Sequence, residues 1–263
     1  MKFGPRMVYI PPMRHEVHGL RDFYATPAGL VAARLLRDRI RAVWPRLAGQ
    51  AVLGLGYASP FLRAWRPGER HGPARCVSLV PAHLPQWRWP RSAASRTAVG
   101  EGEVLPFPDL MFDRILLVHG LEHAENARRL LREAWRVLKD DGRLLVVVPN
   151  RHGLWAHLER TPFGHGEPYS TGQLERLLRR QMFAVTRREA ALYVPPFRTR
   201  MLLRSAGMWE RLGSRLCPGF AGVTLMEATK DFSELIPAGA VPAAARRRRV
   251  VVAEGVQSRH GDC

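Results

Sequence analysis

Residues 54–60, Gly-Leu-Gly-Tyr-Ala-Ser-Pro, follow a short apolar run and could bring the backbone close to a bound ligand. Glycine has no Cβ, so a turn that contains Gly54 and Gly56 can approach a nucleotide more closely than other residues allow. A nicotinamide dinucleotide would also need an acidic residue about 20 positions later to hold its ribose hydroxyls. Residues 70–100 contain no aspartate or glutamate, which argues against a nicotinamide-dependent dehydrogenase.

Five histidines lie between residues 119 and 165, and two of them, His119 and His123, have a spacing that is found in metal sites. The pair spans the end of an expected strand, however, and no cysteine stands beside it, so we expect no metal site. The three cysteines, Cys76, Cys217 and Cys263, are far apart and form no C-x-x-C pair. We therefore expect reduced thiols and neither a disulfide framework nor a structural zinc site.

Apolar runs that alternate with helical patterns predict the elements that position these residues. The expected strands lie at 51–56, 75–80, 96–99, 112–120, 143–150, 183–194 and 222–230. The expected helices lie at 26–44, 124–142, 171–182 and 197–216. Thr26 and Pro27 are typical of a helix start, and Gly142 is typical of a helix end. This alternation predicts an α/β, doubly wound, mostly parallel sheet, with ligands at the carboxyl ends of its strands.

The most specific pattern is a run of about fifty residues. It reads Glu101-Gly-Glu103-Val-Leu-Pro-Phe-Pro-Asp109, then Phe112-Asp113, then Leu121-Glu122-His123, then Arg136-Val-Leu-Lys-Asp-Asp-Gly142, and ends at Val148-Pro-Asn150. In order and spacing it resembles the class I S-adenosylmethionine-dependent methyltransferases, most closely the branch with the run LPFPD…FD…EH…RVLKPGG. The resemblance implies a Rossmann-like fold with a final antiparallel strand, S-adenosylmethionine as cofactor, and methyl transfer to an unidentified acceptor.

The resemblance also implies which residues bind the cofactor. Glu101 stands where the family has an acidic residue that reaches the adenine amino group. Gly56 and Tyr57 stand in the first glycine loop, beside the amino-acid end of the cofactor, and His119 and His123 stand near the adenine and the sulfonium. The full expected set is Gly54, Gly56, Tyr57, Glu101, Glu103, His119 and His123.

Two positions depart from the family pattern. Gly54 replaces the acid that ends the first strand, and Ala58 and Pro60 replace later glycines of the loop. Val80 stands where the family has the acid that binds the ribose. A hydrogen bond to a charged group contributes roughly 1.5–3 kcal/mol, so the loss of that carboxylate should weaken cofactor binding about 10- to 150-fold. A catalytically inactive scaffold is therefore an alternative.

The loop at 150–170 is rich in glycine, histidine and aromatic residues, and it should bind the acceptor. The candidates are Arg151, Trp155, His165 and Tyr169. A surface loop with packing aromatics is the alternative interpretation. We assign no catalytic base, because a sulfonium methyl group is already electrophilic and needs mainly an aligned nucleophile.

Charge leaves a second alternative open. The chain has 41 basic and 23 acidic residues and a formal net charge of +18, which is typical of nucleic-acid binding. Arg246–Arg249 add a basic cluster, so a nucleic-acid-associated binding protein is an alternative. However, 38 of the 41 basic residues are arginine, and a GC-rich coding bias would produce the same excess of arginine. Residues 101–150 alone hold more acidic than basic residues, nine against seven. This segment suits a cofactor with a sulfonium cation.

We expect an N-terminal extension at 1–25, a methyltransferase-like domain at 26–236, and a basic, disordered tail at 237–263. No run approaches the roughly 18 apolar residues of a membrane span, and the start of the chain has no signal-peptide pattern. We therefore expect a cytoplasmic protein without membrane contact.

Overall fold

The computed structural model describes residues 18–65, 70–84, 89, 95–158, 161–195 and 205–232, and those up to Asp231 belong to one compact unit. The strands are β1 Ala51–Gly56, β2 Arg75–Pro81, β3 Thr97–Gly100, β4 Phe112–Val118, β5 Leu138–Pro149, β6 Phe183–Ala191 and β7 Val223–Lys230. The α-helices are α1 His18–Ala25, α2 Pro27–Val43, α3 Ser59–Leu62, α4 Ala127–Val137, α5 Thr171–Arg180 and α7 Ala206–Leu216. Three short 3-10 helices are η1 Leu154–His157, η2 Pro162–Gly164 and η3 Pro218–Phe220.

The seven strands form one sheet in the order β3-β2-β1-β4-β5-β7-β6. Strands β1 to β5 are parallel, and β7 runs antiparallel to both β5 and β6. The predicted α/β, mostly parallel sheet with a final antiparallel strand is thus confirmed. The strand order reverses between β1 and β4, and in such sheets ligands bind outside the carboxyl ends of the strands at this point.

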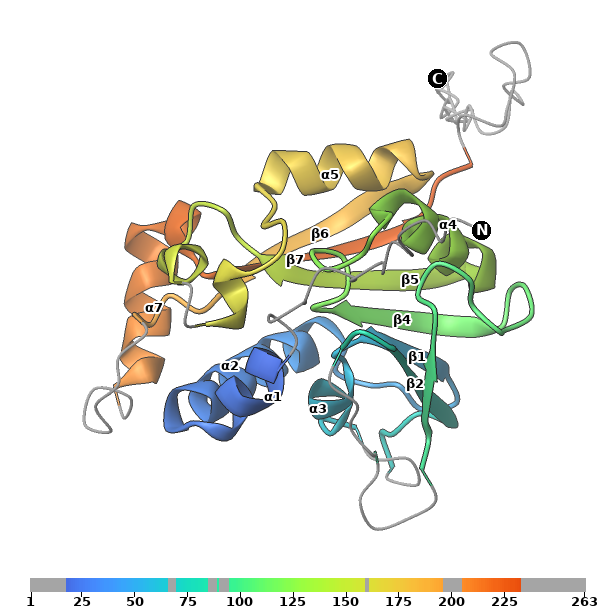
Figure 1. Ribbon diagram of the computed structural model, residues 1–263, viewed down its shortest axis with the longest axis horizontal. Helices are drawn as coiled ribbons and strands as arrows, with labels where there is room; N and C mark the ends of the chain where they lie inside the picture. The colour runs from blue at the N-terminus through green and yellow to red at the C-terminus, as the bar shows by residue number, and fades with distance from the viewer. Residues whose placement is uncertain are drawn as a thin grey trace, which may run out of the picture. The chain divides into compact units, whose positions relative to one another are not determined.

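Helices cover both faces of the sheet (Figure 1). Helices α1, α2 and α3 pack on one face, where α2 contributes the fully buried Leu36. Helices α4 and α5 pack on the other face through Leu131 and Leu174. In β4, Leu116 belongs to the first core and Leu117 to the second, as the two-residue period of a strand requires. Burial on both faces explains why the central strand β1 and the second half of β4 read as continuous apolar runs.

Helix α2 begins as predicted. The Thr26 hydroxyl oxygen accepts a hydrogen bond from the backbone N–H of Gly29 at 3.0 Å, and Pro27 occupies the first helical position. Residues 18–25, which the sequence places in an extension, form α1, and the side chains of Phe23 and Tyr24 are buried in the core. The division of the chain into domains stays a prediction.

The predicted boundary between α4 and β5 was wrong. The helix expected at 124–142 begins later, because the Asn126 side chain caps it by accepting from the N–H of Arg129, and it ends at Val137. Leu138 already has extended backbone, is fully buried and pairs with Phe112 in β4. Gly142 therefore lies inside β5 instead of ending the helix, since pairing with β4 outweighs the helical period of the sequence.

Several expected features lie outside the described residues. The helix expected at 197–216 is described only from Ser205 onward, where α7 follows. The expected tail, with Arg246–Arg249, is not among the described residues. In the described part of the chain, every helix is too short or too polar to cross a bilayer.

Candidate functional site

A cavity of about 280 Å³ opens where β2, β3 and β4 end, at the edge of the sheet that the strand order favours for ligands. We call it the acidic cavity. Its lining residues are Pro81, Ala82, His83, Gly100, Glu101, Gly102, Glu103, Gly120, Ala124, Glu125 and Leu130. Two of the seven predicted cofactor-binding residues, Glu101 and Glu103, are among them.

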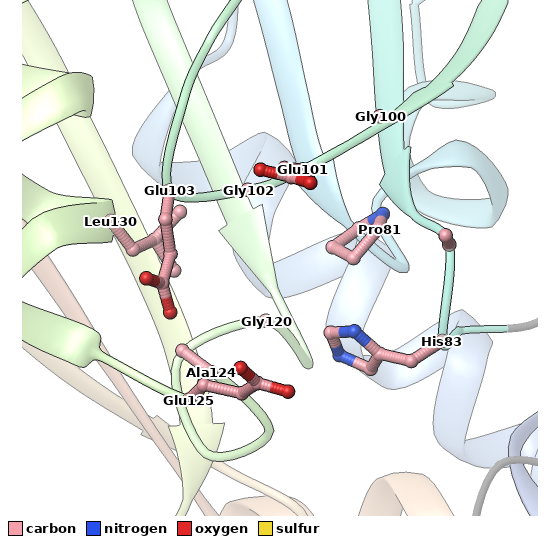
Figure 2. Close-up of a pocket in the computed structure, with 11 residues that line it drawn as sticks. Pro81, His83, Gly100, Glu101, Gly102, Glu103, Gly120, Ala124, Glu125 and Leu130 are labelled. Atoms are coloured by element: carbon pink, nitrogen blue, oxygen red, sulfur yellow. The ribbon is translucent and has the colours of Figure 1, made fainter.

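Three carboxylates and one imidazole surround the acidic cavity (Figure 2). Glu101 and Glu103 follow β3, and the Glu103 carboxylate accepts a hydrogen bond from the backbone N–H of Asn126 at 2.5 Å. His83, after β2, and Glu125, before α4, point toward each other across the cavity (Figure 2). Sequence reasoning missed His83 and Glu125. Three carboxylates in a chain of net charge +18 favour a ligand that carries positive charge or hydrogen-bond donors.

Arg136 fixes the segment that carries Glu101 and Glu103. Its guanidinium donates to the carbonyl oxygens of Leu105 and Phe107, each at 2.9 Å, and to the Asp109 carboxylate at 2.6 Å. Glu133 completes the clamp, because it accepts from Arg136 and from the backbone N–H of Leu105 at 2.9 Å. The LPFPD motif and the arginine of the RVLK motif are therefore two halves of one hydrogen-bonded unit, with α4 as the support.

Replacing Glu133 with glutamine should remove a stabilisation that depends on pH. The Arg136 guanidinium, which donates to the carboxylate, holds the pKa of Glu133 below its usual value. Such a carboxylate stabilises the fold above its unfolded-state pKa and loses this contribution as the pH falls through its folded-state pKa. We expect Glu133→Gln to lower the free energy of unfolding by about 1–3 kcal/mol at pH 7, and by much less near about pH 3. Urea denaturation at both pH values measures this, and an equal loss at both would contradict it.

The first glycine turn lies against the end of β4. Gly56 has a φ of +72°, and a Cβ there would stand 2.5 Å from the carbonyl oxygen of Val118 and 2.9 Å from the Cα of Gly120. At Gly54 a Cβ would meet the Leu62 side chain at 2.7 Å, so the acid that the family has at this position does not fit beneath α3. Val80 is also buried. Gly54 and Val80, which depart from the family pattern, therefore both lie in the packed core.

Tyr57 and His119 are buried beside this turn, away from the acidic cavity's lining. The Tyr24 hydroxyl lies 2.7 Å from Nε2 of His119, and Nδ1 of His119 lies 2.8 Å from the Glu122 carboxylate. The Tyr57 ring stacks on that of Tyr24, with 5.6 Å between centroids and 17° between planes. Sequence reasoning missed Tyr24, which is 95 residues away from His119. His123 is half-buried against the backbone of Gly166.

The predicted acceptor residues lie in three different places. Arg151 and Tyr169 line a second hollow of about 500 Å³ between the ends of α4 and α5, and burial raises the pKa of the Tyr169 phenol to about 12. Trp155 is in the core, where its indole N–H donates to the carbonyl oxygen of Val194 at 2.8 Å. His165 follows η2 and is half-buried. The role of all four in acceptor binding stays a prediction.

No group of three His, Cys, Asp or Glu side chains in the described ranges is arranged to hold a metal ion. Cys76 and Cys217 are both free, and burial raises the pKa of the Cys76 thiol to about 12.

Residues 53–146 match the protein family described as a methyltransferase domain. A ubiquinone/menaquinone biosynthesis C-methyltransferase from Bordetella avium is 48% identical over 54 residues, which cover 20% of this chain and 21% of that protein. An uncharacterized protein from Mycobacterium bovis is 30% identical over 137 residues, which cover 49% of this chain and 47% of that protein. The matched region is thus about a fifth of the first relative and about half of the second.

Solved structures share the fold at low sequence identity. One is an S-adenosylmethionine-dependent methyltransferase from Thermotoga maritima, described as a possible histamine N-methyltransferase. It has a TM-score of 0.56 and 17% identity, over 81% of this chain and 96% of that one. Another, from Burkholderia thailandensis, is 1,6-didemethyltoxoflavin-N1-methyltransferase with bound 1,6-didemethyltoxoflavin and S-adenosylhomocysteine. It has a TM-score of 0.51 and 17% identity, over 82% of this chain and 84% of that one.

Proposed function

We propose that this chain is a class I S-adenosylmethionine-dependent methyltransferase, which binds that cofactor at the acidic cavity and transfers its methyl group to an acceptor. The observation that carries the proposal is the position and charge of the cavity. It lies at the carboxyl ends of β2, β3 and β4 and is lined by three glutamates, although the chain as a whole is strongly basic.

The residues of the acidic cavity suit the adenosine part of the cofactor. Glu101 can accept from the adenine amino group, as the family resemblance implies. Glu125 and His83 face each other across the cavity and offer partners for ribose hydroxyls, a role that the buried Val80 does not fill (Figure 2).

Fewer side chains are placed to bind the amino-acid end of the cofactor. Gly54 leaves no space for the usual acid, and Tyr57 is buried under α1, so binding of this end must rely on backbone groups of the glycine turn. We therefore expect weaker binding than an intact family motif gives, by about 10- to 150-fold for each lost charged hydrogen bond.

When bound, S-adenosylmethionine supplies an activated methyl group on a positively charged sulfur. The residues of this chain contribute by holding the cofactor and orienting its methyl group. Glu101, Glu103 and Glu125 lower the cost of placing a cation in a basic protein, and the clamp of Arg136 and Glu133 keeps two of these carboxylates in place. Alignment of a nucleophile with the methyl group can supply several kcal/mol of rate enhancement without a base.

Isothermal titration calorimetry with S-adenosylhomocysteine tests the proposal. We expect binding, and Glu101→Gln should weaken it about 10-fold or more, because the amide cannot offer the same charged acceptor. Asp141→Asn is the matched control, since it removes the same charge from the surface of β5 and should leave the affinity unchanged. Absence of binding at millimolar ligand would contradict the proposal and favour the inactive scaffold. An equal effect of both variants would show that only the overall charge matters.

A further inference from the structure

Helix α7, which lies in the connection between β6 and β7, carries an exposed apolar stripe (Figure 1). Met208, Leu212 and Leu216 stand four residues apart and therefore share one side of the helix. Phe220, in η3, follows directly after the helix. The four side chains have exposed fractions of 60% for Met208, 49% for Leu212, 68% for Leu216 and 62% for Phe220. We call these four residues the α7 face.

The elements that present the α7 face are anchored on their other side. A Cβ at Gly213 would stand 2.4 Å from the Cβ of Tyr193, so α7 packs closely against the residues that follow β6. The Tyr193 hydroxyl also donates to the carbonyl oxygen of Pro218 at 3.3 Å, and the Asn150 amide donates to that of Gly219 at 3.0 Å. Both α7 and η3 are thus fixed in position, and their apolar side chains point away from these contacts.

The exposed charges of α7 are all positive. Arg211 and Arg215 are exposed, and each stands one position before a leucine of the α7 face. The acidic residue of this helix, Glu210, is half-buried, because its carboxylate accepts from the backbone N–H groups of Tyr193 at 2.7 Å and Val194 at 3.3 Å. In the sequence, residues 196–204 add three arginines and no acid. Aliphatic side chains and guanidinium groups therefore share the outer side of this helix.

This combination of side chains fits the surface of an anionic bilayer better than it fits other partners. A helix that lies in the bilayer interface buries its apolar side chains at the boundary of the acyl chains, while its basic residues meet the lipid phosphates. Nucleic acid would bind the arginines through its phosphates but would leave the aliphatic stripe without a partner. A second copy of this chain could cover the stripe, but it would bring like charges together.

We propose that the α7 face docks this protein on an anionic lipid surface. Its apolar side chains enter the boundary between headgroups and acyl chains, and Arg211 and Arg215 bind lipid phosphates. The net charge of +18 draws the chain toward such a surface over a longer range. The sequence predicts no membrane contact because it lacks an apolar span, but a helix that lies on the surface needs no such span.

Co-sedimentation of the full chain with lipid vesicles tests the proposal. We expect binding to vesicles that mix phosphatidylglycerol with phosphatidylcholine, and about 10-fold weaker binding to phosphatidylcholine alone. Leu216→Gln should weaken binding to the mixed vesicles about 5-fold, because a polar side chain gains less from leaving water. Leu30→Gln is the matched control, since Leu30 is 58% exposed in α2, outside the α7 face, and it should leave binding unchanged.

The arginines are tested in the same way. Arg211→Gln with Arg215→Gln should weaken binding to the mixed vesicles about 10-fold and should make it less sensitive to added salt. Arg34→Gln with Arg41→Gln removes the same charge from exposed positions of α2 and should have a clearly smaller effect. Equal effects of the two double variants would contradict a specific role of α7.

Cys217 allows a direct measurement of the contact, because it is exposed and follows Leu216, whereas Cys76 is buried. In a chain with Cys263→Ser, a polarity-sensitive dye on Cys217 should shift its emission to shorter wavelength when the mixed vesicles are added. The same dye on Leu30→Cys, in a chain that also carries Cys217→Ser and Cys263→Ser, should not respond.

Three results would overturn the proposal. The first is no binding to the mixed vesicles. The second is binding without a response of the dye on Cys217, which would assign the attraction to the charge of the whole chain. The third is a dimer that forms without lipid and that Leu216→Gln dissociates, since a second copy would then cover the α7 face. Binding of S-adenosylhomocysteine should be equal in all these variants, so failure of vesicle binding leaves the proposed function intact.

Discussion

Gly56→Ala should lower the free energy of unfolding by about 2–6 kcal/mol and abolish binding of S-adenosylhomocysteine. A residue with a side chain at a φ of +72° costs about 1–3 kcal/mol in backbone strain. The new Cβ would also stand 2.5 Å from the Val118 carbonyl oxygen, and relief of such an overlap costs about 1–3 kcal/mol more. The atoms it would displace belong to β4 and to Gly120, so the damage extends to the wall of the acidic cavity.

Variants at two other glycines distinguish the cost of backbone strain from the cost of steric overlap. Gly49 has a φ of +78°, and a methyl group added there would have nothing within 4 Å, so Gly49→Ala should cost about 1–2 kcal/mol, from strain alone. Gly207 lies in α7 with open space around it, and Gly207→Ala should stabilise by about 0.5–1 kcal/mol. Urea denaturation of the three variants measures this order. A loss at Gly56 no larger than that at Gly49 would contradict the close approach of β1 to β4.

The central strands could be predicted because they are short apolar runs separated by turn residues, which is the usual sequence pattern of a strand buried on both faces. All seven expected strands are present in the structure. The error at Leu138 has a physical cause. This residue satisfies the helical period of α4 and also the pairing of β5 with Phe112, and only the tertiary structure decides between them.

The sequence predicts those residues of the candidate site that stand close together in one motif. It does not predict those that only the fold brings together. Glu101 and Glu103 stand within one motif, and both line the acidic cavity. Tyr24 approaches His119 across 95 residues, and no spacing in the sequence indicates that contact. The role of Arg136 was also hidden, since an arginine on an amphipathic helix is usually a solvated side chain, whereas here it binds three positions of the LPFPD segment.

The composition of loop 150–170 does not decide whether Trp155 binds the acceptor or packs in the core. A tryptophan in a loop that is rich in glycine and histidine is equally typical of an acceptor pocket and of a packed core. In the structure its ring is 2% exposed and lies edge-on to Phe163 and Phe23, at 5.3 and 6.0 Å. Gly222 packs against the same ring so closely that a Cβ there would overlap with it. Trp155 is therefore one of the side chains that hold loop 150–170 against α1 and the start of β7.

Trp155→Ala should lower the free energy of unfolding by about 3–5 kcal/mol, the cost of deleting a large buried aromatic. The lost indole N–H would also leave the Val194 carbonyl oxygen without its 2.8 Å donor. Trp155→Phe is the matched control, because it keeps an aromatic ring while removing the donor, and it should cost clearly less. Urea denaturation compares the two. If Trp155→Ala left stability unchanged and weakened only acceptor binding, Trp155 would belong to the acceptor pocket. A large loss of stability assigns it to the packing that holds α1 against the core.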